Sequence, residues 1–357
     1  MILEVVEDSE TGLKAALAVV RGEGLSFGGT RFSCHSSPEE VLELALCMEA
    51  KLRPHRPEIG GAKAGFFCSP QDPRLPQLLE KAATQWRPLL EERVVLGKDM
   101  GASDTTMAKL YAAVGLPQLG VLRDPSAPAW LRNFPGYRQH MTGQGVCWAL
   151  KEVHEGCMEG VRVAIQGAGA VGLGSAVRLL REGAQIVAIS DIEHTVLLQK
   201  DLREDELLGL VARGRLQTKG GPVREWGPRE QLFHEEADAV VLAASSHSVD
   251  APQAEGLRAG CVVEGSNFGL TPGAREVVAL RGLTVVPDVM ASSASAAMVA
   301  HQLFARGRAA PSELWANIEA CIRREVRQGL KHWRECGESL RSRAFRKAGI
   351  EQRQRLL

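Results

Sequence analysis

Residues 161–191, VRVAIQGAGAVGLGSAVRLLREGAQIVAISD, decide the fold, because they have the order of a complete βαβ unit. An apolar run at residues 161–165 leads into a glycine-rich turn and then into a helical pattern that closes at Gly183. A second apolar run, at residues 186–189, ends on Asp191. The stretch therefore predicts two parallel strands joined by a helix, the repeating unit of an α/β sheet.

The turn GAGAVG has glycine at each place where a dinucleotide-binding turn needs one. Gly167 allows the tight strand-to-helix turn, Gly169 lets the backbone approach a pyrophosphate, and Gly172 lets helix and strand pack closely. The N-terminus of the helix offers free N–H groups and a partial positive charge to phosphates. Asp191 then stands where a carboxylate accepts hydrogen bonds from the adenosine ribose. We therefore interpret the stretch as a nucleotide-binding Rossmann unit.

Length, composition and charge narrow the class of protein. The chain has 357 residues, more than one core usually holds, so two domains are expected. Hydrophobic residues make up 45% and charged residues 24%, as in ordinary soluble globular proteins. The formal net charge is zero, so no overall field recruits nucleic acid or an anionic membrane. The arginine-rich stretch after Arg306 also contains glutamates, and we interpret it as a solvated helix face or a subunit contact.

The start of the chain and its cysteines indicate a cytoplasmic protein. The acidic segment MILEVVEDSE lacks the basic flank of a signal peptide, and no apolar run approaches the ~18 residues of a membrane span. The eight cysteines are scattered without a CxxC pair, so we expect reduced thiols. No metal site is expected, because His35, His140 and His247 have no ligand spacing around them.

The N-terminal half carries glycines and charged residues beside its predicted strands and helices. Residues 1–35 alternate like strands and include FGGTR, in which two glycines precede an arginine. A helix capped by Ser37 follows, then a glycine-rich loop that leads into an apolar strand, and later a strand that ends at an acid bracketed by glycines. The charged residues of these four segments, in chain order, are Arg31, Lys51, Lys63 and Asp99.

The order of these segments resembles that of the glutamate, leucine, phenylalanine and valine dehydrogenases. In that family GGxR, a helix-borne lysine, a GGxK loop and a strand-end aspartate follow one another as they do here. The twelve-residue spacing of Lys51 and Lys63 suits the shorter leucine and phenylalanine members. The second half continues the resemblance with the motifs TGQGV, EGSN and VVPD, at residues 142–146, 264–267 and 285–288.

The resemblance implies an α/β fold with a Rossmann coenzyme domain and a mixed-sheet substrate domain completed by C-terminal helices. It places the substrate domain at residues 1–135, the NAD-binding domain at 136–289, and helices of 290–357 packed back on the first domain. The apolar runs and helical patterns of the second half agree with that arrangement. The runs are at residues 239–242, 261–264 and 283–286, and the helices are expected at 291–304, 311–329 and 331–347.

The implied reaction is the NAD-dependent oxidative deamination of an L-amino acid to its 2-oxo acid and ammonia, or the reverse reductive amination. By the resemblance, Lys63 is the general acid/base, Asp99 moves protons to and from the nitrogen, and Lys51 holds the α-carboxylate. A buried lysine beside other cations has a lowered pKa, which suits an acid/base. Without this framework we would place both lysines on the surface. The expected partners are the amino acid or its 2-oxo acid and ammonia. We expect the chain to form a homo-oligomer and to bind neither nucleic acid nor a membrane.

NAD is the expected coenzyme. Asp191 would repel a 2′-phosphate, and Ile192-Glu193 offers no arginine to receive one. By the resemblance, Thr142 contacts the nicotinamide carboxamide and Asn267 the nicotinamide ribose. The expected coenzyme-binding residues are Thr142, Gly167, Gly169, Ala170, Val171, Gly172, Asp191, Ala243 and Asn267.

The expected substrate is a hydrophobic amino acid, with aromatic side chains ahead of branched aliphatic ones. Members of the family that take glutamate hold its side-chain carboxylate with a lysine just before the GGxR glycines, where this chain has Phe27. Burying an unpaired carboxylate against an aromatic ring costs several kcal/mol, so glutamate should be rejected. The expected substrate-binding residues are Lys51, Phe27, Gly28, Gly29, Gly97, Ala296 and Val299.

One turn departs from the family pattern. After Pro287-Asp288 the family has Asn-Ala-Gly-Gly four residues later, whereas residues 292–295 here read SSAS, so both glycines are lost. Lys98 also stands beside Asp99, where an acid is common. Two alternatives therefore stay open: a nucleotide-binding paralogue without turnover, and a reductase of a preformed imine on the same fold in a specialised pathway. The sequence does not name the amino acid, the physiological direction or the number of subunits.

Overall fold

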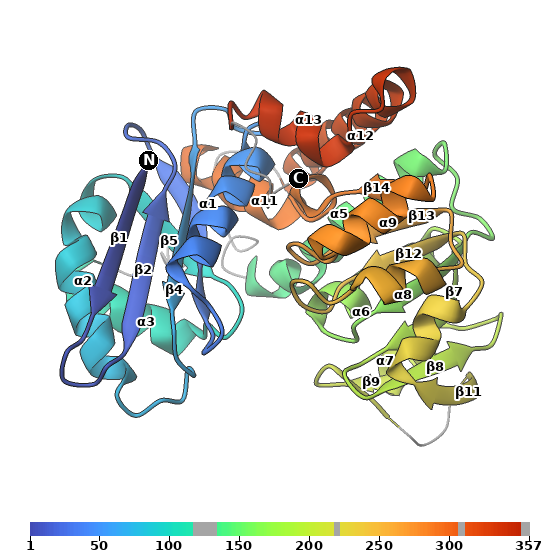
Figure 1. Ribbon diagram of the computed structural model, residues 1–357, viewed down its shortest axis with the longest axis horizontal. Helices are drawn as coiled ribbons and strands as arrows, with labels where there is room; N and C mark the ends of the chain where they lie inside the picture. The colour runs from blue at the N-terminus through green and yellow to red at the C-terminus, as the bar shows by residue number, and fades with distance from the viewer. Residues whose placement is uncertain (117–133, 218–221, 306–310, 351–357) are drawn as a thin grey trace.

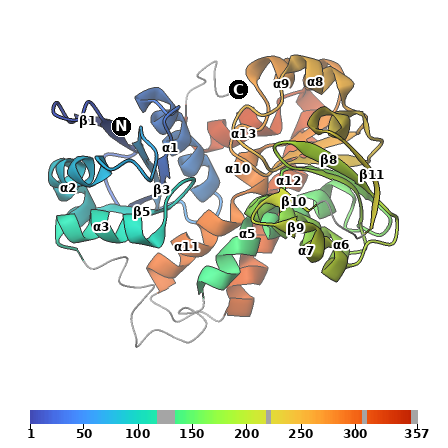
Figure 2. The same ribbon diagram turned by 90° about the horizontal axis from the view of Figure 1, so that it is seen from below.

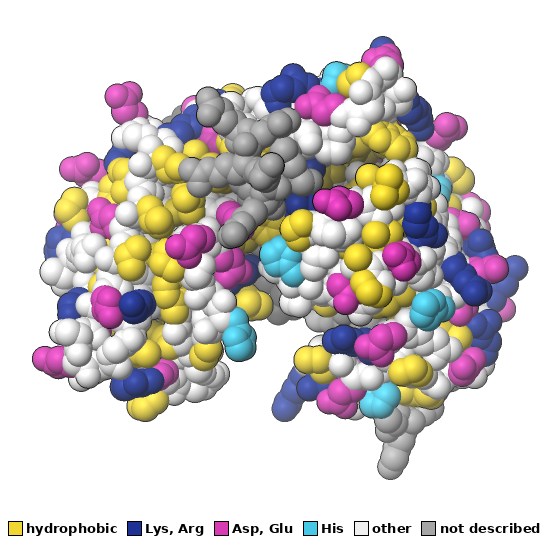
Figure 3. All heavy atoms as spheres, viewed as in Figure 1, with side chains coloured by type: hydrophobic (Ala, Val, Ile, Leu, Met, Phe, Trp, Pro, Cys, Tyr) yellow, Lys and Arg dark blue, Asp and Glu magenta, His cyan; other side chains and the backbone are white. Residues whose placement is uncertain are grey.

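The computed structural model describes residues 1–116, 134–217, 222–305 and 311–350, which form two bodies, each built on a β-sheet (Figure 1). Among these residues, the first body has a five-stranded sheet and the second has a seven-stranded sheet. The last helices of the chain lie over and between the two bodies, so the chain returns to its first half (Figure 2). The space-filling view shows a notch between the bodies (Figure 3).

The five-stranded sheet is mixed. Its order is β1-β2-β4-β3-β5, with β3 parallel to β4 and β5 and the other pairs antiparallel. Helix α1 (Pro38–Leu52) packs on one face, and α2 (Leu75–Glu92) and α3 (Asp104–Val114) pack on the other. Ser37 caps α1 as predicted, its Oγ accepting from the backbone N–H of Glu40 at 3.2 Å. The strands are β1 (Ile2–Glu7), β2 (Lys14–Val19), β3 (Ser26–Phe32), β4 (Gly60–Phe66) and β5 (Val94–Lys98).

The segment around Lys63 is the buried strand β4, not the loop that we predicted from its glycines. Helix α1 lies directly against this strand. A side chain at Gly61 would place its Cβ 2.3 Å from the backbone nitrogen of Glu49 and 2.4 Å from the carbonyl oxygen of Ala45, both on α1. The glycine therefore allows close helix–strand contact rather than a turn. In the sheet, Lys63 lies opposite Gly29 of β3.

The seven-stranded sheet contains the βαβ unit predicted from residues 161–191. β6 (Arg162–Gln166), α6 (Ala170–Arg181) and β7 (Gln185–Ser190) follow in the expected order. The sheet order is β11-β8-β7-β6-β12-β13-β14. The strands β7, β6, β12, β13 and β14 are parallel to one another. Strands β8 and β11 add an antiparallel edge that we did not predict. The other strands of the sheet are β8 (His194–Leu198), β11 (Val223–Pro228), β12 (Ala239–Leu242), β13 (Cys261–Glu264) and β14 (Thr284–Val286), and the helices that follow β12 and β13 are α8 (Ala251–Gly256) and α9 (Pro272–Leu280).

Helices outside the two sheets join them. α5 (Phe134–Val153) packs on α6, α12 packs on α5, and α10, α11 and α13 contact α1. The predicted helix boundary near residue 330 is wrong, because α12 continues to the residue before Gly337, where φ is 74°. Gly329 lies inside α12, where a Cβ would be 2.8 Å from the Leu340 side chain, so glycine permits close contact with α13. The bounds are α10 (Asp288–Ala291), α11 (Ala294–Ala305), α12 (Pro311–Cys336) and α13 (Leu340–Lys347).

The described residues include no helix that is both long and apolar enough to span a membrane. All eight cysteines are free thiols, as expected for reduced residues. Cys47, Cys147 and Cys261 are buried, as their apolar sequence patterns indicated.

Candidate active site

Lys63 is buried in the middle of the first sheet and contacts a carboxylate. Only 3% of its surface is exposed, and its Nζ lies 2.5 Å from Oδ2 of Asp99. The same oxygen accepts from Nε of Arg31 at 3.2 Å, while another nitrogen of Arg31 pairs with Glu40 at 2.6 Å. The sheet register produces this cluster, because β3, β4 and β5 are adjacent parallel strands whose charged residues lie close together. The surface interpretation of this lysine is therefore wrong.

The surroundings shift the protonation of both groups. Burial lowers the pKa of Lys63, and the nearby cations Arg31 and Lys51 lower it further, against the opposing effect of Asp99. Burial alone would raise the pKa of Asp99, but Lys63 and Arg31 outweigh it and hold that pKa well below its usual range. A partly buried ionised carboxylate thus lies beside a lysine that loses its proton more readily than usual, an arrangement suited to proton transfer.

Two glycines let the backbone of β3 approach this cluster closely. A Cβ on Gly29 would lie 2.9 Å from Cβ of Asp99 and 3.5 Å from Nζ of Lys63, so any side chain would crowd the ammonium group. A Cβ on Gly28 would lie 1.6 Å from the carbonyl oxygen of Ala62, which rules out a side chain altogether. The two adjacent glycines of the FGGTR segment are therefore required by the structure, each for a different reason.

Lys51 connects the two bodies of the molecule. It is 6% exposed and lies in the last turn of α1. Its Nζ donates to Oδ1 of Asn267 at 2.6 Å and to Oγ of Ser292 at 2.8 Å, and a carboxylate oxygen of Asp288 lies 3.8 Å away. The structure thus brings Lys51 and Asn267 together, although they are 216 positions apart in the sequence.

A buried arginine that we did not predict completes this region. Arg341, at the start of α13, is 4% exposed and pairs with both Glu264 and Asp288. Burial alone would lower the pKa of Arg341, but its two carboxylate partners raise it, and Arg341 in turn lowers the pKa of Asp288. The predicted solvated face or subunit contact is therefore wrong for this arginine. An alternating chain of charges runs from Lys51 through Asp288 and Arg341 to Glu264.

The divergent turn at residues 292–295 is held by its own serines. Oγ of Ser292 donates to the carbonyl of Asp288 at 2.8 Å while accepting from Lys51. Ser293 donates to the carbonyl of Met290 at 2.8 Å, and its Oγ lies 3.2 Å from Nε2 of His55. Burial, with His301 and Arg324, lowers the pKa of His55 to about 3, so its imidazole is neutral. The hydroxyls of Ser292 and Ser293 therefore give the turn local partners without the family's asparagine.

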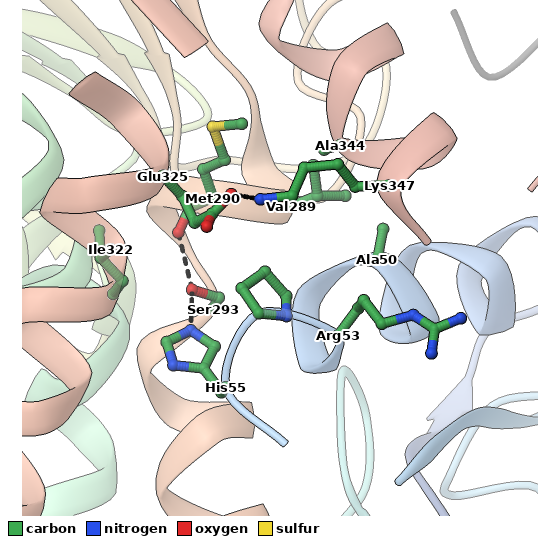
Figure 4. Close-up of a pocket in the computed structure, with 11 residues that line it drawn as sticks. Ala50, Arg53, His55, Val289, Met290, Ser293, Ile322, Glu325, Ala344 and Lys347 are labelled. Carbon is green, nitrogen blue, oxygen red and sulfur yellow. Dashed lines mark hydrogen bonds and ion pairs between the residues drawn. The ribbon is translucent and has the colours of Figure 1, made fainter. Parts of the chain in front are cut away.

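A pocket lies behind this turn and is separate from the Lys63 cluster (Figure 4). Ser293 and His55 lie on one side of it, and the Glu325–Lys347 ion pair lies on the other. It is lined by residues of α10, α12 and α13 and by the end of α1, and neither Lys63 nor Asp99 lines it. This pocket is therefore part of the packing behind the turn, not the place where the lysine and aspartate could act.

The glycine-rich turn after β6 has the form expected of a dinucleotide site. Gly167 has φ of 103°, a conformation that favours glycine, and a Cβ on Gly172 would lie 1.8 Å from the carbonyl oxygen of Gly167. A Cβ on Gly169 would meet nothing described within 4 Å, so the backbone there faces open space. Ala170 and Val171 begin α6 and direct its N-terminus at that space. The chain's residues therefore fit the pyrophosphate of a dinucleotide.

Asp191 has backbone partners that the sequence did not reveal. One carboxylate oxygen accepts from the N–H groups of Glu193 and His194, each at 2.8 Å, and the other accepts from Leu216 at 3.0 Å. Leu216 belongs to a hairpin of β9 (Val211–Ala212) and β10 (Arg215–Leu216), which follows α7 (Glu204–Leu210). Asp191 therefore fixes this hairpin at the carboxyl end of β7.

The hairpin brings two arginines to the edge of the nucleotide site. A Cβ on Gly214, at its tip, would lie 3.7 Å from Cα of Gly169. Arg213 is exposed beside Gly214, and Arg215 pairs with Glu193 at 2.7 Å. The sequence argument considered only Ile192 and Glu193, neither of which is an arginine; the structure adds Arg215, whose charge helps to lower the pKa of Asp191.

The other residues predicted for the substrate and coenzyme sites lie on β3, β5, α5 and α11 and after β12. Phe27 is buried and its ring lies 3.5 Å from the position of a Cβ on Gly97, on the neighbouring strand. Val299 belongs to the same apolar cluster as Phe27, and Ala296 packs against that cluster. Thr142 lies on α5 beside Gly143, where a Cβ would be 2.4 Å from the backbone of α6. The carbonyl oxygen of Ala243, which follows β12, would lie 2.6 Å from a Cβ on Gly167.

The chain is similar to known dehydrogenases over most of its length. Curated relatives include an NAD-specific glutamate dehydrogenase of Staphylococcus aureus (strain COL), 29% identical over 279 residues. An NADP(+)-dependent glutamate dehydrogenase of Pyrobaculum calidifontis is 29% identical over 288 residues. In both cases the match covers 76% of this chain and 67% of the relative. A hetero-hexameric glutamate dehydrogenase of Thermus thermophilus, solved in a leucine-bound form, superposes with a TM-score of 0.77 at 24% identity, over 97% of this chain and 87% of that one.

Two family models match the chain. The model described as Glutamate/Leucine/Phenylalanine/Valine dehydrogenase matches residues 136–352, and the model of the Glu/Leu/Phe/Val dehydrogenase dimerisation domain matches residues 14–114. The family prediction and the predicted α/β dehydrogenase fold are thereby confirmed, while the closer likeness to the leucine and phenylalanine members stays a prediction. The chain belongs to the glutamate/leucine/phenylalanine/valine dehydrogenase family and is an amino-acid dehydrogenase.

Proposed function

We propose that this chain catalyses the NAD-dependent oxidative deamination of a hydrophobic L-amino acid to its 2-oxo acid, or the reverse reductive amination. The observation that carries the proposal is the buried Lys63–Asp99 pair, which the backbone of Gly29 approaches closely. The apolar surroundings of Phe27, where glutamate-specific members have a lysine, support the choice of substrate class.

The Lys63–Asp99 pair divides the proton transfers between two groups. Lys63, with its lowered pKa, takes a proton from the water that hydrolyses the imine. Asp99 is ionised, and its Oδ2 faces Lys63, so it can move protons to and from the substrate nitrogen. Arg31 holds that carboxylate in place from the other side. The same groups serve both directions, because each proton transfer is reversible.

Lys51 holds the α-carboxylate of the substrate. An ammonium group has three N–H donors, and Lys51 gives two of them to Asn267 and Ser292. One donor is left for a substrate carboxylate. Because Asn267 belongs to the second body, the same lysine also fixes the distance between the substrate and the coenzyme-binding sheet.

NAD supplies the acceptor for the hydride that leaves the substrate Cα. Gly167, Gly169 and Gly172 with the N-terminus of α6 would hold its pyrophosphate, and Thr142 and Asn267 would hold the nicotinamide end. We propose a preference for NAD over NADP, because a 2′-phosphate would meet the ionised carboxylate of Asp191, whose pKa its backbone partners lower against the effect of burial. The hairpin arginines act against this preference, so the discrimination should be incomplete. The comparison to make is kcat/KM for NAD and NADP, and equal or higher values with NADP would contradict the preference.

The substrate side chain is proposed to lie against Phe27, Gly97, Ala296 and Val299. None of these residues carries a charge, so a glutamate carboxylate placed there would be buried without a partner. A carbon atom at the Cβ position of Gly97 would be in van der Waals contact with the Phe27 ring, and an aromatic substrate that reached this ring would gain about 0.5–1.5 kcal/mol from ring contact beyond area burial.

A competition assay tests the proposed function. Phenylalanine, tryptophan, leucine and glutamate are offered together with NAD at alkaline pH, and the product oxo acids are quantified. We expect the phenylalanine or tryptophan product to dominate, the leucine product to follow, and the glutamate product to be nearly absent. Glutamate as the preferred substrate would refute the pocket assignment. Tight NADH binding with no turnover of any amino or oxo acid would refute the activity and favour a nucleotide-binding paralogue.

We also propose that the protein works as a homo-oligomer, since residues 14–114 match a dimerisation-domain model; the Thermus thermophilus relative is a hetero-hexamer, which supports assembly but not identical subunits. Light scattering on the purified chain decides this, and a monomer at micromolar concentration would contradict it.

A further inference from the structure

A cluster of possible metal ligands lies at the junction of α12 and α13, away from the candidate active site. His332 and Cys336 are one helical turn apart on α12, so their side chains lie on the same face. The left-handed conformation of Gly337 then ends the helix and turns the chain back. As a result Glu338 lies beside His332, with its Oε2 2.6 Å from Nε2 of the imidazole.

The three side chains offer the donor types that zinc takes from proteins, namely an imidazole nitrogen, a thiolate and a carboxylate oxygen. Their ligand atoms lie within 4.8 Å of one another, and Nε2 of His332 is 3.2 Å from Sγ of Cys336. Around a tetrahedral zinc ion with bonds of about 2.0–2.3 Å, neighbouring ligand atoms are about 3.3–3.8 Å apart. A small outward rotation of the imidazole and the carboxylate would therefore make room for the ion.

Arg346 of α13 bonds the ligand atoms of this cluster and places a positive charge beside them. Its guanidinium bonds both oxygens of Glu338, at 3.0 and 2.7 Å. The nitrogen that bonds Oε2 of Glu338 also lies 3.4 Å from Nε2 of His332, so the guanidinium occupies two atoms that the ion would need. It also places a positive charge next to the ion, which weakens binding. Removal of the arginine should therefore strengthen metal binding at this position, whereas it should leave a site elsewhere unaffected.

We propose that His332, Cys336 and Glu338 bind one divalent ion of the zinc type, with water as the fourth ligand. On binding, the Cys336 thiol releases its proton to solvent and coordinates as a thiolate. The ion would join the end of α12 to α13, the helix that carries the buried Arg341. The sequence expectation of no metal site rested on three other histidines and overlooked the spacing His-x3-Cys-x-Glu.

Cobalt(II) titration of the full-length, chelator-treated protein is the direct test, because a thiolate ligand gives cobalt a charge-transfer band in the near ultraviolet. We expect saturation at one ion per chain and displacement of the cobalt by zinc. Cys336→Ser should abolish the band, His332→Ala should weaken binding at least ten-fold, and Arg346→Gln should strengthen it. Cys157→Ser removes another exposed thiol and should behave like the unmodified chain.

Three outcomes would overturn the proposal. The first is the absence of stoichiometric binding in the unmodified protein. The second is a band that persists in Cys336→Ser or disappears in Cys157→Ser, since the thiolate would then belong to another site. The third is an Arg346→Gln protein with unchanged affinity. All these substitutions are at exposed or partly exposed positions near a helix end or in a loop, where the fold should tolerate them.

Discussion

Lys51 and Lys63, the two buried lysines among the residues that the structure describes, have nearly the same exposure but different partners. Lys63 contacts one ionised carboxylate and lies near two cations, and its pKa is lowered. Lys51 donates to the neutral oxygens of Asn267 and Ser292, with a carboxylate at 3.8 Å. Burial alone therefore does not assign a role to a lysine. The partners suit Lys63 to proton transfer and suit Lys51 to holding an anion at a fixed place.

The largest expected effect follows from removal of the proton-transfer group. Lys63→Ala should lower kcat by about two to four powers of ten, the usual contribution of a positioned acid/base. NADH affinity, followed by fluorescence, should be nearly unchanged, because Lys63 lies in the first sheet. A Lys63→Ala enzyme with full activity would remove this residue from the mechanism.

Lys51→Ala is the matched control for that experiment, since it removes the other buried lysine. It should raise KM for the amino acid much more than it lowers kcat, because the contact of Lys51 with the α-carboxylate stabilises the bound substrate as well as the transition state. If both substitutions changed the same kinetic constant by the same factor, the distinction between the two lysines would fail.

The buried charges behind Lys51 should matter most for stability. Arg341→Met leaves Glu264 and Asp288 buried without their shared cation, and the expected loss is about 3–5 kcal/mol. Urea unfolding followed by circular dichroism measures it. Arg181→Met breaks the exposed pair with Glu204 and should cost no more than about 1 kcal/mol. Equal shifts of the urea unfolding midpoints of the two variants would mean that the buried charges stabilise the fold no more than the exposed pair does.

The smallest effect concerns the serine turn. Ser292→Ala removes one acceptor of Lys51 and should raise KM about three- to ten-fold, in keeping with roughly 1 kcal/mol for a net hydrogen bond. Ser293→Ala instead removes the contact with His55 and should leave KM unchanged. A larger KM effect from Ser293 would show that the turn, rather than the Lys51 contact, controls substrate binding.

The βαβ unit could be predicted because it depends on local patterns, whereas the roles of Lys63 and Asp99 were implied by the resemblance to the family. The turn at Gly167 to Gly172 has one glycine for each steric requirement, and the structure confirms the requirements at Gly167 and Gly172. The order of Lys51, Lys63 and Asp99 was read from motifs. The contact between Lys63 and Asp99 then follows from the register of the adjacent strands β3, β4 and β5, whereas Lys51 lies on α1.

Arg341 and the hairpin at Asp191 could not be predicted, because their partners are distant in the sequence. The segment around Arg341 is rich in charged residues and has the pattern of an exposed helix, yet one arginine faces inward to Glu264, which is 77 positions away. The hairpin reaches Asp191 from 25 residues further along the chain. Gly61 was wrongly assigned to a loop for a related reason. It lies in β4, where the close contact with α1 requires glycine, and the sequence alone does not distinguish such a glycine from a turn residue.

The central claim, that Lys63 is the titrating acid/base, is tested most directly by the pH dependence of kcat/KM for deamination in the unmodified enzyme and in Asp99→Asn. Lys63 must lose its proton to activate water, so the rate should rise with pH through its pKa. Asp99 raises that pKa, against burial and the nearby cations that lower it. Removing the carboxylate's charge should therefore move the rising limb to lower pH, whatever happens to the maximal rate. A limb that stays in place, or moves to higher pH, would contradict the account.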